Sequence, residues 1–171
     1  AQVDGNWLGG SISNQFRLIP QYSDLDITAG PTPGATAPFC VGQVVNWTST
    51  ISNLNSSIVG GSPEVGYYIG TNTSDYGTQW DTDGLGSIGS YGSSNENQDY
   101  TFTVSDVGTR YMNFWADWAG EIQETNEGNN KASYGPFTVA PQVVSNFTTD
   151  KGITPTVTIT PGTTVYFTDT S

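Results

Sequence analysis

The chain has 171 residues and carries 16 acidic side chains against only 4 lysines and arginines, which gives a formal net charge of −12 at pH 7. Such an acidic surface repels phosphate backbones and anionic lipids, so nucleic acid and membrane surfaces are not expected partners, whereas cations, basic surfaces and neutral glycans are favoured. The sequence has no histidine and no apolar run long enough to span a bilayer, which excludes Ser-His-Asp catalysis and argues against membrane insertion.

Residues 1–22 form an extension that contains one expected strand. Ile12, Phe16 and Leu18 fall on the same side of an extended chain, so one face of this strand can be buried. A single strand is not stable alone and needs a sheet beside it. Two arrangements satisfy this need. The strand can be an extra edge strand on its own domain, or it can insert into a neighbouring copy as a donor strand.

The main domain is expected over residues 23–139 and begins with a short strand at residues 23–27. Three prolines in residues 29–38 exclude an interior strand, and this segment is predicted to be a loop. Alternating apolar residues predict another strand at residues 65–71. Many short strands with Gly and Pro between them are typical of an all-β sandwich.

The clearest central strand covers residues 41–53. Val45, Trp47 and Ile51 share one face of it, with Ser49 between them, and polar residues occupy the other face. This strand is therefore expected to cross the middle of the core.

A long polar segment follows at residues 71–97. Connections of this length are usually functional or form contacts. We expect a short strand near residues 84–88, and the apolar anchors of the segment are Trp80, Leu85 and Ile88. A further strand is expected where apolar residues alternate at Tyr100, Phe102 and Val104.

Residues 108–139 are interpreted as the closing hairpin of the sandwich. Two strand-like runs flank a polar turn network, in which Asn side chains can bond their own backbone. The members of this network are Glu124, Asn126, Glu127, Asn129 and Asn130. We expect the network to pin the last strand to its neighbour.

The order of Tyr111, Asp117 and the turn network is similar to the closing hairpin of the CARDB module, an extracellular β-sandwich repeat of bacteria and archaea. Upstream, residues 42–53 and 65–71 resemble that family's next strands, as does the expected turn at residues 81–84. The resemblance implies an immunoglobulin-like antiparallel β-sandwich over residues 23–139, with a scaffolding role and no enzymatic activity.

After a linker at residues 140–141, residues 143–171 resemble the opening strands of a PKD-type immunoglobulin-like domain. The alternating apolar residues of this segment are Val157, Ile159, Val165 and Phe167. Two or three strands cannot bury enough surface to stand alone. Either the polypeptide continues as a tandem array of modules, or this segment packs on another subunit and the chain forms a homopolymer.

A cation site is the most plausible chemistry for the carboxylates. Asp75, Asp81 and Asp83 lie in one segment and offer hard oxygens of the kind that calcium binds, although a solvated acidic turn explains them too. The network of Glu124 and its neighbours could also gather oxygens, but turn capping is the simpler interpretation. Two carboxylates suffice for a glycosidase, yet a scaffold turn is a poor place for them, so the chain is predicted not to be an enzyme.

Exposed aromatic side chains in a flat row would favour glycan binding, whereas buried ones would belong to the core. The candidates are Trp80, Tyr91, Trp115, Trp118 and Tyr134. Candidate N-glycosylation acceptors are Asn46, Asn55, Asn72 and Asn146. The single cysteine, Cys40, allows no intrachain disulfide. It is expected to be a small buried residue, and the alternative is a reactive or intermolecular thiol.

These observations together predict a secreted or cell-surface structural protein. We expect a subunit of a fibre or filament, assembled from copies of itself by β-strand sharing through residues 12–18 and 143–171. The alternatives are an accessory carbohydrate-binding module of a secreted hydrolase and a calcium-stiffened adhesin repeat.

Overall fold

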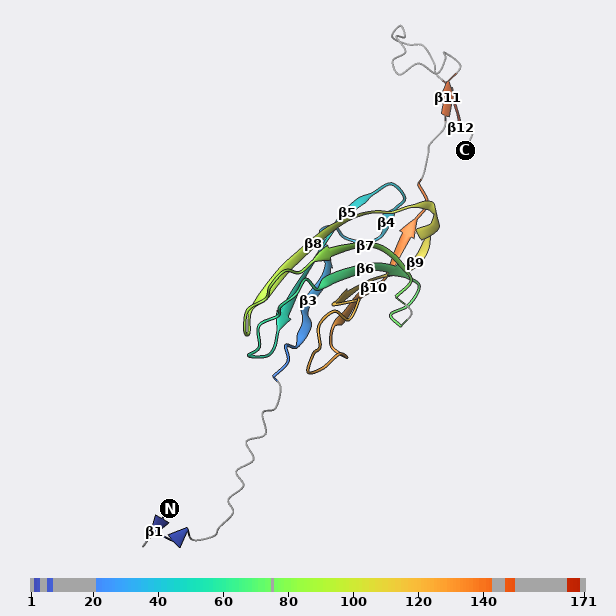
Figure 1. Ribbon diagram of the computed structural model, residues 1–171. Coiled ribbons are helices and arrows are strands. Elements are labelled where there is room, and N and C mark those ends of the chain that lie inside the picture. The colour runs from blue at the N-terminus through green and yellow to red at the C-terminus, as the bar shows by residue number, and fades with distance from the viewer. Residues whose placement is uncertain are drawn as a thin grey trace.

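Two β-sheets form a sandwich in the computed structural model of the chain (Figure 1). The structure describes residues 2–3, 6–7, 21–74, 76–142, 147–149 and 166–169. One sheet has three strands in the order β3-β5-β8, and the other has five in the order β4-β10-β9-β6-β7. The pairs within both sheets are antiparallel except for the short parallel pair of β4 with β10. The prediction of an all-β, immunoglobulin-like sandwich is confirmed.

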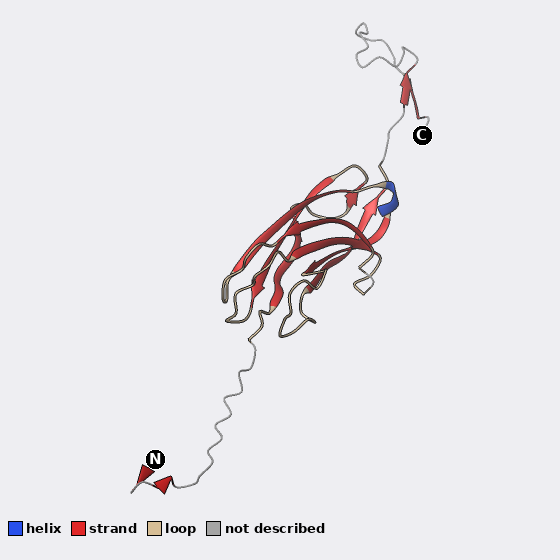
Figure 2. Ribbon diagram, viewed as in Figure 1, coloured by secondary structure: helices blue, strands red, loops and turns tan. Residues whose placement is uncertain are grey.

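The three-stranded sheet consists of β3 (Leu25–Pro33), β5 (Val44–Asn53) and β8 (Ser93–Thr101). The five-stranded sheet consists of β4 (Phe39–Cys40), β6 (Glu64–Gly70), β7 (Thr78–Gly84), β9 (Gly108–Ala116) and β10 (Lys131–Ala140). The described part of the chain has one helix, the short 3-10 helix η1 (Val104–Asp106; Figure 2), and so no helix that could span a membrane. Two further strand pairs are β1 (Gln2–Val3) with β2 (Asn6–Trp7) and β11 (Phe147–Thr149) with β12 (Phe167–Asp169).

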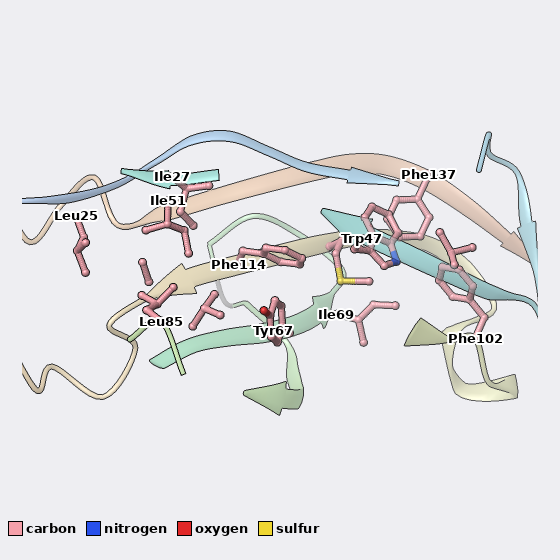
Figure 3. Close-up of a cluster of buried hydrophobic side chains, with 14 of the residues drawn as sticks. Leu25, Ile27, Trp47, Ile51, Tyr67, Ile69, Leu85, Phe102, Phe114 and Phe137 are labelled. Carbon is pink, nitrogen blue, oxygen red and sulfur yellow. The ribbon is translucent and has the colours of Figure 1, made fainter. Parts of the chain in front are cut away.

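Strand β5 is the central strand that the alternation predicted. It pairs with β8 without a register shift, and its inward residues Val45, Trp47 and Ile51 are almost fully buried. Trp47 lies beside Phe137 in the core (Figure 3). Its ring centroid is 5.6 Å from that of Phe137, 5.9 Å from that of Phe39 and 5.5 Å from that of Tyr134. Inward side chains of β6, β9 and β10 cover β5 from the opposite sheet, which closes the core.

The Pro-rich segment after residue 28 differs from its prediction as a loop, because β3 continues to Pro33. Register shifts after Ile27 and Ala29 interrupt its pairing with β5. Proline is tolerated in an edge strand, where its missing N–H would have faced solvent. The prolines therefore mark an edge and not the absence of a strand.

Two other strand predictions are wrong. The expected strand at residues 84–88 lies earlier, as β7, so the expected turn at residues 81–84 is part of a strand. Leu85 and Ile88 are nevertheless buried anchors, as expected. Strand β8 ends at Thr101, and Val104 begins η1 with an exposed side chain, because Asp106 caps this turn through the backbone N–H of Thr103.

Several predicted interface residues lie outside the described residues. They are Ile12, Phe16, Leu18, Val157, Ile159 and Val165. Phe167 is the first residue of β12, which pairs with β11.

The chain enters the sandwich at one end and leaves it at the other. At the first end, Thr125 donates to the Ser23 carbonyl and Leu54 donates to the Asp24 carbonyl. At the second end, Val41 donates to the carbonyl of Ala140. The ten residues of β5 run between these ends and span about 30 Å. We call the end formed by residues 21–24, 54–62, 85–92 and 117–130 the entry pole, and the end formed by residues 41–44, 102–107 and 140–142 the exit pole.

Two glycines have left-handed backbones but different surroundings: Gly77 lies in the β6–β7 connection, and Gly42 lies between β4 and β5. Comparing them tests how tightly the β6–β7 connection is packed. Gly77 has φ +78°, and a Cβ there would lie 2.1 Å from the carbonyl oxygen of Ile69, whereas Gly42 has φ +83° and open space around it. Gly42→Ala should lower the free energy of unfolding by about 1 kcal/mol, from backbone strain alone. Gly77→Ala should lower it by at least about 2 kcal/mol, because the backbone must also move. Urea unfolding of both variants measures the difference, and equal losses would contradict the close packing.

Candidate functional site

The predicted turn network is assembled around Glu124, a carboxylate that is only 6% exposed. Its Oε2 accepts a hydrogen bond from the backbone N–H of Leu25, and its Oε1 accepts one from Nδ2 of Asn130 at 2.6 Å. Leu25 begins the first strand of the sandwich, and Asn130 immediately precedes the last. One buried side chain therefore joins the start of β3 to the loop between β9 and β10.

The other members of the network shape this loop and fasten it. Oδ1 of Asn126 accepts from the N–H of Gly128 at 3.0 Å, and Oε1 of Glu127 accepts from the N–H of Glu124 at 3.0 Å. Nδ2 of Asn129 donates to Oδ1 of Asp24 at 3.0 Å. The sequence suggested that the network pins the last strand to its neighbour, whereas these bonds reach the first strand. No pattern in the sequence of residues 21–25 indicates that they bind the turn network.

Acidic groups surround Glu124. The pKa of Glu124 is raised to about 7, mainly by burial and to a smaller extent by the nearby charges of Glu127 and Asp117, against the lowering effect of its hydrogen bonds with Leu25 and Asn130. Asp117 is itself buried, with a left-handed φ of 50°, and accepts from the N–H groups of Glu121 and Ile122. The loop therefore holds two buried carboxylates, Glu124 and Asp117, each of which accepts two hydrogen bonds.

Two of the three predicted calcium ligands lie on β7. Asp81 accepts from the side chain of Gln98 and from the N–H of Thr82, and Asp83 accepts from the N–H of Gly84. Asp75 lies outside the described residues. Among the residues that are described, no group of three Asp, Glu, His or Cys side chains could hold a metal ion. The calcium site stays a prediction.

The candidate aromatic residues have different surroundings. Trp80 packs against Tyr67 and Tyr100, and Tyr134 packs against Trp47. Trp118 donates from Nε1 to Glu64. Tyr91 is the most exposed of the five, at 71%. Two of the candidates therefore belong to the core and its margin, and Tyr91 lies at the entry pole.

Trp115 belongs to an aromatic cluster on the outer side of the five-stranded sheet. The Lys131 ammonium lies 3.6 Å from the Trp115 ring centroid and 4.9 Å from that of Tyr76, within the range of cation–π attraction. Asn113, fully buried, donates to the carbonyls of Asn72 and Tyr76 and so holds the β6–β7 connection over this cluster. Sequence reasoning missed the cluster, because Lys131 and Tyr76 are far apart in the chain.

The candidate modification residues also have defined positions. Asn46 is exposed on β5 and donates to Asp99, while Asn55 donates to Thr125 at the entry pole. Oδ1 of Asn72 accepts from the N–H of Ser74, and Asn146 lies outside the described residues. Cys40 was expected to be buried, but it is exposed, because it faces outward on the short edge strand β4.

Comparison with known proteins relates the sandwich to a known fold. No family model matches the sequence, and no curated protein matches it. The crystal structure of a CARDB domain from Pyrococcus furiosus, in complex with di-metal ions, is 21% identical, with a TM-score of 0.54; the match covers 72% of this chain and 99% of that one. The solution structure of the CARDB domain of that protein is also 21% identical, with a TM-score of 0.55, over 71% and 98% of the two chains.

A provisionally named cell-surface protein domain from Methanosarcina acetivorans is 23% identical, with a TM-score of 0.48, over 69% of this chain and 93% of that one. The two Pyrococcus structures show that the sandwich has the CARDB fold.

Proposed function

We propose that this chain is an extracellular, non-enzymatic structural or adhesion module, and that it is a subunit of a surface fibre in which copies share β-strands. One observation carries the proposal: the polypeptide enters the sandwich at one pole and leaves it at the other. Its first and last strands are each held by a contact in addition to their antiparallel pairing with the neighbouring strand. Glu124 holds the start of β3, and the parallel pair of Phe39 with Val139 holds the end of β10. When units are joined end to end, each is held by its neighbours through its first and last strands, so contacts that secure both strands stabilise the unit.

Strand sharing would use the two flanking segments. Residues 12–18 and 143–171 each carry alternating apolar residues that require a partner face, and the second segment resembles the opening of a PKD-type domain. Main-chain hydrogen bonds between copies would give strength, and pockets for alternate side chains would set the register. The acidic surface keeps copies soluble until these segments engage.

A calcium-stiffened adhesin repeat is the second candidate, because the Pyrococcus CARDB domain was crystallised with di-metal ions. An ion that binds only the folded form raises the melting temperature. Melting in calcium and in chelator tests this candidate. A carbohydrate-binding module has less support, because Trp80 and Tyr134 pack on core aromatics and Trp115 lies under Lys131.

Electron microscopy of the native assembly tests the fibre directly. We expect fibres with one chain per repeat from the full chain, and discrete particles from a variant that lacks residues 1–20. The truncated variant should keep the near-ultraviolet circular dichroism of the full chain, because the core is built from residues 25–139. Discrete monomers of the full chain at high concentration would contradict the fibre.

A further inference from the structure

The exposed apolar side chains of the sandwich lie at its two poles. Large apolar residues with more than a third of their surface exposed are Leu54, Ile58 and Tyr91 at the entry pole and Val44, Val104 and Val107 at the exit pole. Within residues 21–142, the outer faces of the two sheets carry no other side chain of this kind. Isolated exposed apolar residues are common, but apolar groups gathered at particular places mark contact surfaces.

The three entry-pole residues lie on two connections that are bound to each other. Tyr91 donates from its backbone to the carbonyl of Asn55, and Val59 donates to the carbonyl of Ile88. Nδ2 of Asn53 also bonds to the carbonyls of Ser57 and Gly89. These bonds join the two connections that carry Ile58, which is 66% exposed, and Tyr91, which is 71% exposed.

The exit pole combines apolar side chains with a hollow. Gly42 donates to the Phe102 carbonyl and Phe102 donates to that of Gln43, so Val44 and the η1 turn lie at the same end. Beside them, residues 40–43 and 140–142 line a hollow with a volume of about 520 Å³. Its volume is large enough to hold an aromatic or branched side chain.

We propose that the poles are complementary docking surfaces, so that the exit pole of one copy stacks on the entry pole of the next. Tyr91 and Ile58 are the projecting groups, and the hollow beside Cys40 receives them. This inference rests on the proposed fibre, in which copies follow one another. The contact that it adds is between the sandwiches of consecutive copies and is separate from strand sharing. A head-to-tail contact of this kind does not close, and so it continues along one direction.

The attachment points of the flanking segments favour a second copy as the occupant. Residues 1–20 join the sandwich at the entry pole, and residues 143–171 follow the exit pole. A strand shared between consecutive copies therefore brings an exit pole to an entry pole. The tether raises the effective concentration of the two poles, so a contact too small to be stable alone suffices.

The net charge of −12 opposes the contact, because like-charged copies repel each other. Salt screens this repulsion and leaves apolar contacts intact. Pole-to-pole association should therefore strengthen as ionic strength rises. A contact based on ion pairs would weaken instead.

The single native cysteine makes the test direct, because Cys40 is exposed and lines the exit-pole hollow. In the full chain, Tyr91→Cys adds a thiol at the entry pole. Mild oxidation should then give a ladder of disulfide-linked oligomers, because each copy carries one thiol at each pole. Thr48→Cys, on the exposed face of β5, is the matched control and should crosslink at least tenfold less. Ile58→Cys serves as a second entry-pole variant.

Cys40→Ser combined with Tyr91→Cys should abolish the ladder beyond dimers. Ile58→Ser with Tyr91→Ser, in the otherwise native chain, should weaken association measured by sedimentation about tenfold or more. Equal crosslinking of Tyr91→Cys and Thr48→Cys, or no ladder at all, would overturn the proposal. Fibres without the ladder would refute pole stacking alone, whereas a ladder without fibres would refute the fibre and leave the pole contact.

Discussion

Trp47→Ala should lower the free energy of unfolding by about 3–5 kcal/mol, because it removes the largest side chain in the centre of the core. Trp47 is fully buried between the sheets and touches rings from β4 and β10. The surrounding aromatic residues come from different strands and cannot all close over the space that is left. Since whole domains are stable by about 5–15 kcal/mol, this single loss takes a large part of the total. Urea unfolding followed by tryptophan fluorescence measures it.

Two further variants identify the cause of the loss. Trp47→Phe keeps an aromatic ring and removes Nε1, which is buried without a hydrogen-bond partner among the described residues, so its loss should be clearly smaller than that of alanine. Trp115→Ala removes a partly exposed ring that packs under Lys131 and should cost at most about 1–2 kcal/mol. A loss at Trp47 no larger than the loss at Trp115 would contradict the central place of Trp47.

The centre of the fold follows from local patterns. In β5, polar residues alternate with Val45, Trp47 and Ile51 over ten residues, and only a strand with one buried face satisfies that order. The β9–β10 hairpin is equally readable, because aromatic runs flank a turn rich in Asn and Gly. Here the periodicity and the turn chemistry agree, so these strands, their inward faces and the pairing of β9 with β10 as a hairpin could be predicted.

The edges of the sheets could not be read in this way. Proline breaks a central strand but is tolerated at an edge, and the sequence near Pro31 does not say which edge the chain will occupy. The partner of Glu124 is equally hidden, because its Oε2 bonds to a backbone N–H, which every residue except proline offers. The exposure of Cys40 depends on the parallel pair of β4 with β10, a tertiary contact between segments about 100 residues apart.

Protonation of Glu124 should make the folded chain more stable in mild acid than at neutral pH. The pKa of Glu124 is raised from 4.5 in the free side chain to about 7 in the folded chain, mainly by burial. The folded state therefore binds this proton more tightly than the unfolded state does. The stabilisation is complete below pH 4.5 and is lost as the pH rises through about 7, with a total of about 3 kcal/mol.

Glu124→Gln keeps the size of the side chain and removes its titration, and its Nε2 group, a donor, replaces one of the two oxygens that accept from Leu25 and Asn130. The free energy of unfolding of the wild-type chain, measured by urea between pH 4 and pH 8, should fall more steeply than that of the variant. Between pH 4 and pH 8, the difference in the free energy of unfolding between the two proteins should therefore shift in favour of the variant by about 3 kcal/mol. Glu121→Gln, at an exposed position of the same loop, should follow the wild-type curve. If the Glu124→Gln variant followed the wild-type curve as well, the pKa of Glu124 would be the same in the folded and the unfolded chain. The fastening of the first strand would then not depend on pH.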